Sequence, residues 1–125
     1  MANLTIFTAP KAFTNPHINT IQRNAIQSWQ HLGDDVDVLL VGEEDGMADV
    51  ADEYNVLHLP DVSRNEWGTP LVSSIFELAR LSSNSPLLAY VNADILLMPD
   101  FVKAANVVAA QLKKFLVVGQ RWDLE

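Results

Sequence analysis

The stretch that most constrains the fold is Leu87–Asp100, in which an uncharged apolar run leads into a short polar segment. The run Leu87–Val91 contains no charge, which is the pattern of a strand covered on both faces. Such strands are typical of parallel sheets that carry helices on both sides. The polar triplet Asn92-Ala93-Asp94 follows directly, and a second apolar run then closes at Pro99. Because an unpaired buried carboxylate is very costly, Asp94 must be solvated, hydrogen-bonded or bound to a cation.

Short β-rich runs alternate with helical patterns along the rest of the chain. Cap-then-proline pairs at Asn15-Pro16 and Thr69-Pro70 predict two helix starts, and Pro99-Asp100 opens a later helix. The first of these helices is expected to stop at Gly33. We expect strands at residues 4–8, 37–41, 56–59, 87–91 and 115–119.

Each expected helix has one apolar face, from the three- and four-residue spacing of its hydrophobic residues. The predicted inward residues, helix by helix, are Ile18, Ile21, Ala25, Trp29 and Leu32, then Met47, Val50, Ala51 and Tyr54, then Val72, Ile75, Phe76 and Ala79, and last Phe101, Ala104, Ala105, Val108 and Leu112.

This alternation predicts one α/β domain over residues 1–125, built as a three-layer α/β/α sandwich. Right-handed crossovers favour a doubly wound, mainly parallel sheet of about five strands in the order 3-2-1-4-5 or a similar one. Winding then reverses between the first and fourth strands, so the loop after Thr8 and the segment Asn92–Asp94 should flank one crevice. The acidic turn after Val41 and the long loop Pro60–Thr69 should open on the same edge.

The amino-acid composition limits which kinds of partner and which cellular compartment we expect for this chain. The net charge of -8 argues against nucleic acid or an anionic membrane as the main partner. The chain has no cysteine, which excludes disulfides, thiolate nucleophiles and sulfur-ligated zinc. The N-terminal residues lack the features of a secretion signal, and no apolar run approaches the ~20 residues of a membrane span. We therefore expect a soluble cytoplasmic domain.

A hard divalent ion is one possible ligand for the polar triplet. A spacing of two along an extended segment places Asn92 and Asp94 on the same side. Magnesium and manganese are commonly held by one or two carboxylates together with water and the diphosphate of a substrate. In the alternative reading, Asp94 caps a turn and Asn92 is an ordinary loop residue.

The other polar segments also have two readings each. Arg64 could contact a phosphate, or lie on the surface paired with Asp61. Trp67 could stack on a base or sugar, or cover the end of the sheet. The acidic turn Glu43–Asp45 could contact a ribose or base, or be a solvated turn. The histidines show no metal-ligand spacing, and His17 and His58 are expected to be structural.

Several well-known site motifs are missing from the sequence. There is no Gly-x-Gly-x-x-Gly after the first strand, which disfavours the usual dinucleotide-binding fold. There is also no Gly-x-x-x-x-Gly-Lys-Ser/Thr phosphate loop and no Gly-x-Ser-x-Gly nucleophile elbow.

Taken together, these features resemble the nucleotide-sugar-binding half of GT-A-type glycosyltransferases, in particular family-2-like enzymes, whose sheet is Rossmann-like. Four segments carry the likeness: the opening strand Thr5–Pro10, the second strand with its acidic turn, the loop Arg64–Gly68 before a helix, and the strand ending Tyr90–Ile95. In the last of these the family carries its Asp-x-Asp motif.

The resemblance implies a donor site for a nucleotide-diphospho-sugar. Thr8, Ala9 and Pro10 would border the nucleoside, and Glu44 or Asp45 would face the base. Asp94 would bind a divalent Mn or Mg ion that bridges the diphosphate, and Asn92 would lie near the ribose or the metal. The remaining residues that the resemblance places in this site are Ala93, Arg64, Asn65, Trp67 and Gly68.

Two departures from the family pattern limit what the resemblance implies. Asn92 replaces the first acid of the motif, which removes a negative charge and should weaken metal binding. The chain also stops before the acceptor-binding half and the catalytic base of the family. We therefore expect a donor-binding part of a longer protein, inactive on its own, with catalytic residues and acceptor unidentified. Its apolar sheet edge would favour self-association into a homodimer.

Two other functions stay open at this point. A degenerate GT-A-like domain could serve as a catalytically inactive binding or scaffolding module. A nucleotidyltransferase shares this kind of sheet and metal site. That family usually carries a loop rich in glycine and basic residues after the first strand, which Ala9–Ala12 does not supply.

Overall fold

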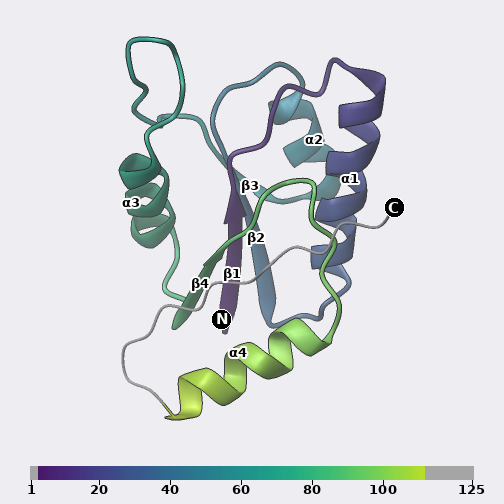
Figure 1. Cartoon of the computed structure of the whole chain (residues 1–125), viewed down its shortest axis with the longest axis vertical. Coiled ribbons are helices and arrows are strands. Elements are labelled where there is room, and N and C mark those ends of the chain that lie inside the picture. Colours follow the sequence, from purple (N-terminus) through teal and green to yellow (C-terminus); the bar gives the residue numbers. More distant parts are fainter. Residues whose placement is uncertain (1–2, 112–125) are drawn as a thin grey trace, which may run out of the picture.

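The computed structural model describes residues 3–111, in which four strands alternate with four helices (Figure 1). The elements follow the predicted order, and a loop lies between each strand and the helix that follows it. Their bounds are β1 (Leu4–Thr8), α1 (Pro16–Gln30), β2 (Val36–Val41), α2 (Met47–Tyr54), β3 (Leu57–Leu59), α3 (Val72–Ser82), β4 (Leu87–Tyr90) and α4 (Asp100–Gln111).

The four strands form one parallel sheet in the order β3-β2-β1-β4. Ile6 on β1 lies opposite Val38 on β2 and opposite Ala89 on β4, so β1 is paired along both edges. This confirms the α/β class and the predicted winding, with its reversal between β1 and β4. The expected fifth strand, residues 115–119, lies outside the described residues.

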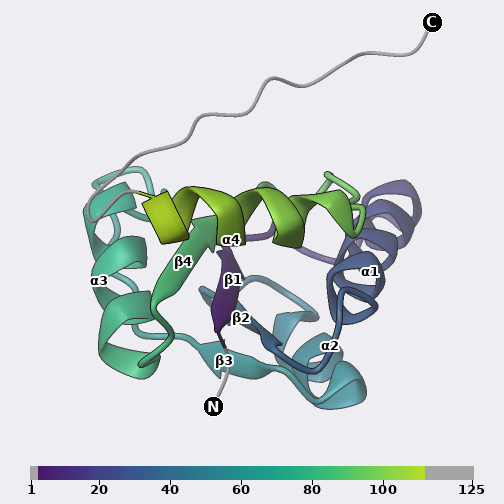
Figure 2. The same cartoon turned by 90° about the horizontal axis from the view of Figure 1, so that it is seen from below.

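Two apolar layers cover the two faces of the sheet, which gives the three-layer arrangement seen end-on in Figure 2. Ile6 and Leu40 point to one face and pack with the buried residues of α1 and α2, among them Trp29 and Val50. Phe7, Leu39 and Val41 point to the other face and pack with Ile75 and Ala79 of α3. Neighbouring residues of β1 and β2 thus pack into opposite layers, and β1 is buried along its whole length.

The helix starts follow the sequence signals in two cases out of three. The Asn15 side chain caps α1 by accepting hydrogen bonds from the backbone of His17 and Ile18, as predicted. The start of α4 at Asp100 also agrees. The predicted cap at Thr69-Pro70 is wrong, because α3 begins at Val72 with Leu71 as its N-cap. Thr69 is instead tied into the preceding loop by its backbone N–H and carbonyl.

The edge at β4 is less covered than the sequence predicts. Leu87, Leu88 and Ala89 are only half-buried and Tyr90 is 40% exposed, although the run was expected to be covered on both faces. The reason is that β4 is the outer strand of the described sheet.

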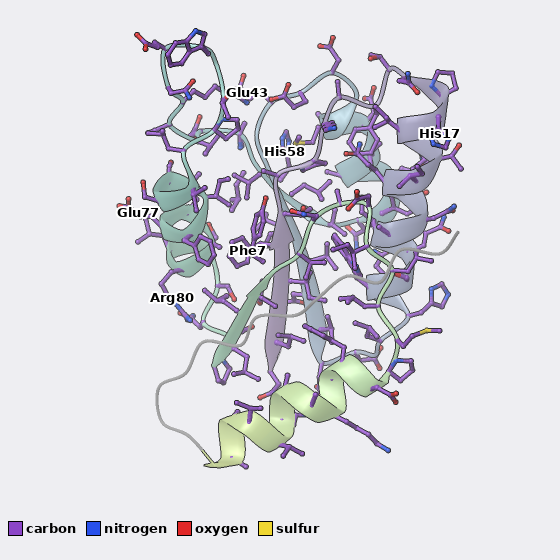
Figure 3. All side chains as sticks on the ribbon, viewed as in Figure 1. Phe7, His17, Glu43, His58, Glu77 and Arg80 are labelled. Carbon is purple, nitrogen blue, oxygen red and sulfur yellow. The ribbon has the colours of Figure 1, made fainter. Side chains whose placement is uncertain are left out.

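The same edge leaves part of α3 uncovered. Val72 is 68% exposed, so the prediction that it faces inward is wrong, while Ile75 and Ala79 are buried as predicted. Phe76 is 45% exposed, but its ring faces the sheet as predicted. Phe76 packs against Phe7, with ring centroids 4.9 Å apart, and Figure 3 shows Phe7 between the sheet and α3.

The last described helix, α4, lies toward the amino ends of the strands (Figure 1) and beside β4, running from the α3 side of the sheet to the α1 side (Figure 2). Phe101 and Val102 pack against the core on the α1 and α2 side, and Asn3 before β1 donates a hydrogen bond to Asn106. Ala104 is exposed, so its predicted inward position is wrong, and Leu112 lies outside the described residues. Within residues 3–111 no helix combines the length and apolar character that crossing a membrane requires.

A buried cluster of hydroxyl groups fixes the turn between α3 and β4 to the start of β1. The Thr5 hydroxyl lies 2.8 Å from that of Ser83 and 2.6 Å from that of Ser85. Arg80 donates to the Ser85 carbonyl from the end of α3. Thr5 and Ser85 are both buried, so these hydroxyls have little water to replace a lost partner.

We predict that Thr5→Val lowers the free energy of unfolding by about 1–3 kcal/mol, because it leaves buried hydroxyls short of a partner. Thr8→Val is the matched control on the same strand. Thr8 is equally buried, but its hydroxyl has no hydrogen-bond partner among the described residues, so this variant should be as stable as the wild type or more stable. Urea unfolding measures both; equal losses would contradict the prediction.

Candidate functional site

The loops after β1, β2 and β3 are joined to one another at the carboxyl edge of the sheet. Phe13 N–H donates to the Asp45 carbonyl at 2.8 Å, which joins the loop after β1 to the turn after β2. Gly42 N–H donates to the Leu59 carbonyl at 2.9 Å and joins that turn to the end of β3. The carboxyl end of β4 adjoins that of β1 through Val91 N–H, which donates to the Phe7 carbonyl. The predicted convergence of four segments is therefore present.

The residues at the end of β1 are largely buried at this edge of the sheet. Thr8 and Pro10 are buried, and Ala9 is half-buried. The loop that follows is held by Gln22 of α1, whose side chain bonds the Lys11 backbone N–H at 2.7 Å and the Lys11 carbonyl at 2.9 Å. Gln22 was not among the predicted site residues, since its only signal in the sequence is its place beside the apolar face of the first helix.

An ion pair links the turn after β2 to the loop after β3. Arg64 Nη1 lies 2.9 Å from Glu44 Oε1, and it also donates to the Gly68 carbonyl at 2.7 Å. The guanidinium passes close to Gly42, where an added Cβ would lie 3.5 Å from Arg64 Nη2. Arg64 therefore pairs with Glu44 and not with Asp61, which corrects the surface reading of this residue. The charges of Arg64 and Glu44 largely cancel each other here.

The rest of this loop is shaped by Asn65. Its side-chain oxygen accepts hydrogen bonds from the backbone N–H of Trp67 at 2.9 Å and of Thr69 at 3.0 Å. Gly68 follows with φ of 81°, a conformation that favours glycine. Trp67 is 80% exposed, so it does not cover the end of the sheet. Asn65 and Gly68 thus organise the loop, and Trp67 presents an indole to solvent.

The segment after β4 is a turn that exposes both predicted metal ligands. Ile95 N–H donates to the Asn92 carbonyl at 3.1 Å, so backbone atoms close the turn. Ala93 is buried, while Asn92 and Asp94 are exposed. The Ile95 carbonyl accepts a hydrogen bond from the indole of Trp29 on α1 at 3.0 Å. Because Asp94 is exposed, water can solvate its carboxylate, and the charge needs no buried partner.

The donor set at this turn suits a hard divalent ion only in part. Asp94 and Asn92 supply oxygen atoms, which magnesium and manganese prefer. Between residues 3 and 111, however, no group of three or more His, Asp or Glu side chains is arranged to hold a metal. An ion at Asp94 would need further oxygens from water and a bound diphosphate. The described residues of this turn therefore do not hold a metal by themselves.

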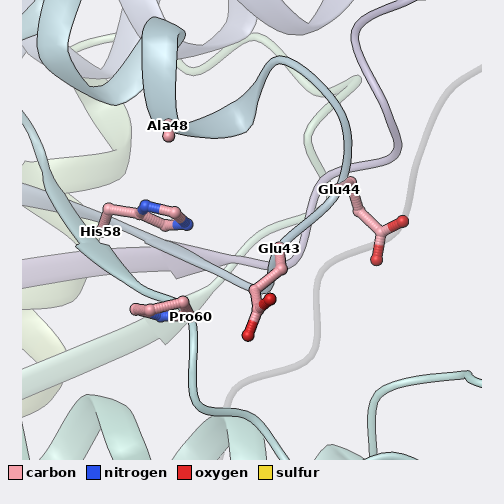
Figure 4. Close-up of a pocket in the computed structure, with 5 residues that line it drawn as sticks. All are labelled: Glu43, Glu44, Ala48, His58 and Pro60. Carbon is pink, nitrogen blue, oxygen red and sulfur yellow. The ribbon is translucent and has the colours of Figure 1, made fainter.

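A shallow pocket of about 410 Å³ opens beside β3, lined by Glu43, Glu44, Ala48, His58 and Pro60. In Figure 4 the His58 ring lies between Ala48 and Pro60. His58 Nε2 lies 2.6 Å from the Gly42 carbonyl. Since a carbonyl can only accept, Nε2 carries a proton. His58 thus holds the turn after β2 in place, in line with the structural role expected for it.

No protein family model, curated protein or solved structure matches the chain. The features that bear on function are those of the carboxyl edge itself: the buried end of β1, the Glu44–Arg64 pair and the exposed Asn92–Asp94 turn.

Tyr90 adds a titratable group beside this edge. Burial raises its pKa above the ordinary value of 10.0, and a hydrogen bond with the backbone of Ala9 lowers that pKa by a smaller amount. Its ring packs against Phe7, with centroids 5.5 Å apart. The neutral phenol is therefore favoured in the folded state.

A raised folded pKa means that the stability contributed by neutral Tyr90 is complete below pH 10.0 and is lost as the pH rises through the folded pKa. We predict that the free energy of unfolding of the wild type falls more steeply above this pH than that of Tyr90→Phe. Denaturant unfolding of both proteins at several alkaline pH values measures the difference, because all other groups titrate in both. Parallel curves would contradict the prediction.

Proposed function

We propose that the chain is the donor-binding domain of a metal-dependent glycosyltransferase and binds a nucleotide-diphospho-sugar for transfer to an acceptor that is unidentified. The observation that supports this most is the meeting of four post-strand segments where the winding reverses between β1 and β4. In open α/β sheets ligands bind at this place. The exposed oxygens of Asn92 and Asp94 at the end of β4 supply the chemistry for a cation-bridged diphosphate.

In this proposal the nucleoside lies over the end of β1, bordered by Thr8, Ala9 and Pro10. Asp45 is the better candidate to face the base, because its carboxylate is exposed while that of Glu44 is paired with Arg64. Trp67 offers an exposed ring for stacking on a base or sugar. Arg64 would reach a phosphate only by giving up part of its contact with Glu44.

Asp94 would hold the metal together with Asn92, and Ala93 between them anchors the turn in the core. When bound, Mn or Mg neutralises the charge that develops on the departing nucleoside diphosphate. With a single carboxylate, the chain's own contribution to the ion is weak. We therefore propose that metal and nucleotide bind together.

A catalytically inactive binding module is the second candidate. It is favoured by one observation, the neutral Asn92 where the family's motif has an acid, which leaves Asp94 as the only carboxylate of the turn. Both candidates share the donor site and differ in turnover. Sugar transfer by the natural protein that contains this domain would exclude the inactive module.

We further propose that the outer edge of β4 favours the homodimer expected from the sequence. The support is that β4 is an apolar strand that is only half-buried and is the outer strand of the described sheet.

For the donor site we predict that uridine or guanosine diphosphate sugars bind more tightly with Mn²⁺ than without it. Asp94→Asn should reduce this Mn²⁺-dependent gain in affinity by more than about tenfold. Thermal stability should stay nearly unchanged, because the Asp94 side chain is exposed. Isothermal titration calorimetry measures both affinities. The matched control is Asp52→Asn on the exposed surface of α2, which should keep the full gain.

Absence of binding by the folded wild type at millimolar ligand would rule out the donor site. A large loss of stability in Asp94→Asn would instead indicate that Asp94 is a structural cap.

A further inference from the structure

Arg64 uses only part of its guanidinium group in contacts with the described chain. Its Nη1 lies 2.9 Å from Glu44 Oε1 and donates to the Gly68 carbonyl at 2.7 Å. Among residues 3–111, neither Nε nor Nη2 of Arg64 donates a hydrogen bond, and Nη2 lies beside Gly42. Arg64 therefore holds Glu44 through one nitrogen, although its planar group can bind an oxyanion through two.

Neither partner of this ion pair is fully buried. The Arg64 side chain is 28% exposed and the Glu44 side chain is 34% exposed. Water can therefore solvate the Glu44 carboxylate when it separates from Arg64, and a small anion can reach the guanidinium. Since ion pairs of this exposure contribute little to stability, a stronger oxyanion ligand can replace the carboxylate.

The two segments that the ion pair joins are each held by other bonds as well. His58 Nε2 donates to the Gly42 carbonyl and so fixes the turn after β2. The loop after β3 is closed by backbone hydrogen bonds and by the side chain of Asn65. Glu44 can consequently separate from Arg64 without the unfolding of either segment.

We propose that Arg64 is a binding site for a phosphate or diphosphate group and that Glu44 is an internal competitor for it. This inference rests on the proposed donor function, which supplies a diphosphate as the natural ligand. A phosphate carries more charge than a carboxylate and offers more acceptor oxygens, so it can bind two guanidinium nitrogens where Glu44 binds one. The contact with Glu44 lowers the affinity of Arg64 for that ligand.

The experiment titrates the full chain with inorganic pyrophosphate in the absence of divalent metal, followed by nitrogen–proton correlation spectra. The backbone amide signals of Glu44 and Gly68 should shift and saturate in the wild type. Glu44→Gln keeps an oxygen that can accept from Arg64 and removes the charge. We expect this variant to bind pyrophosphate about 3- to 10-fold more tightly. Misfolding cannot produce such a gain.

Glu43→Gln is the matched control for the loss of charge. Glu43 is the exposed neighbour of Glu44 in the same turn, and it forms no ion pair within residues 3–111. Its substitution should change the affinity for pyrophosphate by less than about twofold.

A second pair of variants tests the arginine itself. Arg64→Gln should lower the affinity for pyrophosphate by at least about tenfold, because it removes the charged donor. Arg23→Gln breaks the other ion pair of the described chain, between Arg23 of α1 and Glu53 of α2, and should leave the affinity unchanged.

Several results would overturn the proposal. They are wild-type affinity in Glu44→Gln, equal gains in Glu44→Gln and Glu43→Gln, and undiminished binding by Arg64→Gln. A lack of any shift at Glu44 and Gly68 in the wild type and in Glu44→Gln at millimolar pyrophosphate would also overturn it.

Titrations with uridine and guanosine diphosphate sugars, each with and without Mn²⁺, separate this proposal from the donor function. If pyrophosphate binds as expected but no nucleotide sugar binds, the donor function is wrong and Arg64 serves a free phosphate ligand. If nucleotide sugars bind while Glu44→Gln and the wild type bind pyrophosphate equally, the donor function stands and the role of Glu44 is overturned.

Discussion

The central strand β1 is the constraint on which the rest of the structure depends. It is hydrogen-bonded to β2 on one edge and to β4 on the other, and all five of its residues are buried. Ile6 anchors the layer of α1 and α2, while Phe7 anchors the layer of α3. Because the winding reverses at this strand, its carboxyl end is also where the post-strand segments meet. A single strand thus fixes the two apolar layers and the position of the candidate site.

Local signals in the sequence predicted much of this fold, and long-range contacts account for most of what they missed. The apolar runs placed the four described strands, and the Asn15-Pro16 pair marked the start of α1. Thr69-Pro70 failed as a cap because Asn65 holds Thr69 within the loop. Trp29 was assigned to the core from its spacing, which is correct, but its bond to Ile95 joins distant parts of the chain and no local pattern shows it.

Electrostatics explain why a cation is central to the proposed site. The carboxyl edge carries Glu43, Glu44, Asp45 and Asp94. Of its basic residues, Arg64 is already paired with Glu44, and Lys11 lies in the loop after β1. The whole chain has a net charge of -8, so a diphosphate approaching this edge meets mostly negative charge. Backbone amides at the loops offset part of that repulsion. A divalent ion at Asp94 would offset more of it and would do so at the phosphates themselves.

Because Asn92 is neutral, binding of the metal ion and binding of the diphosphate would depend on each other in the proposed site. With one carboxylate at the turn, the protein alone offers a cation too few charged oxygens, and the acidic edge alone offers a diphosphate too little positive charge. In the proposed donor site each ligand would supply what the other lacks, and by linkage each would raise the affinity of the other by the same factor. In the proposed site that factor would depend on how firmly the turn after β4 holds Asp94, and the bond from Ile95 N–H to the Asn92 carbonyl closes that turn.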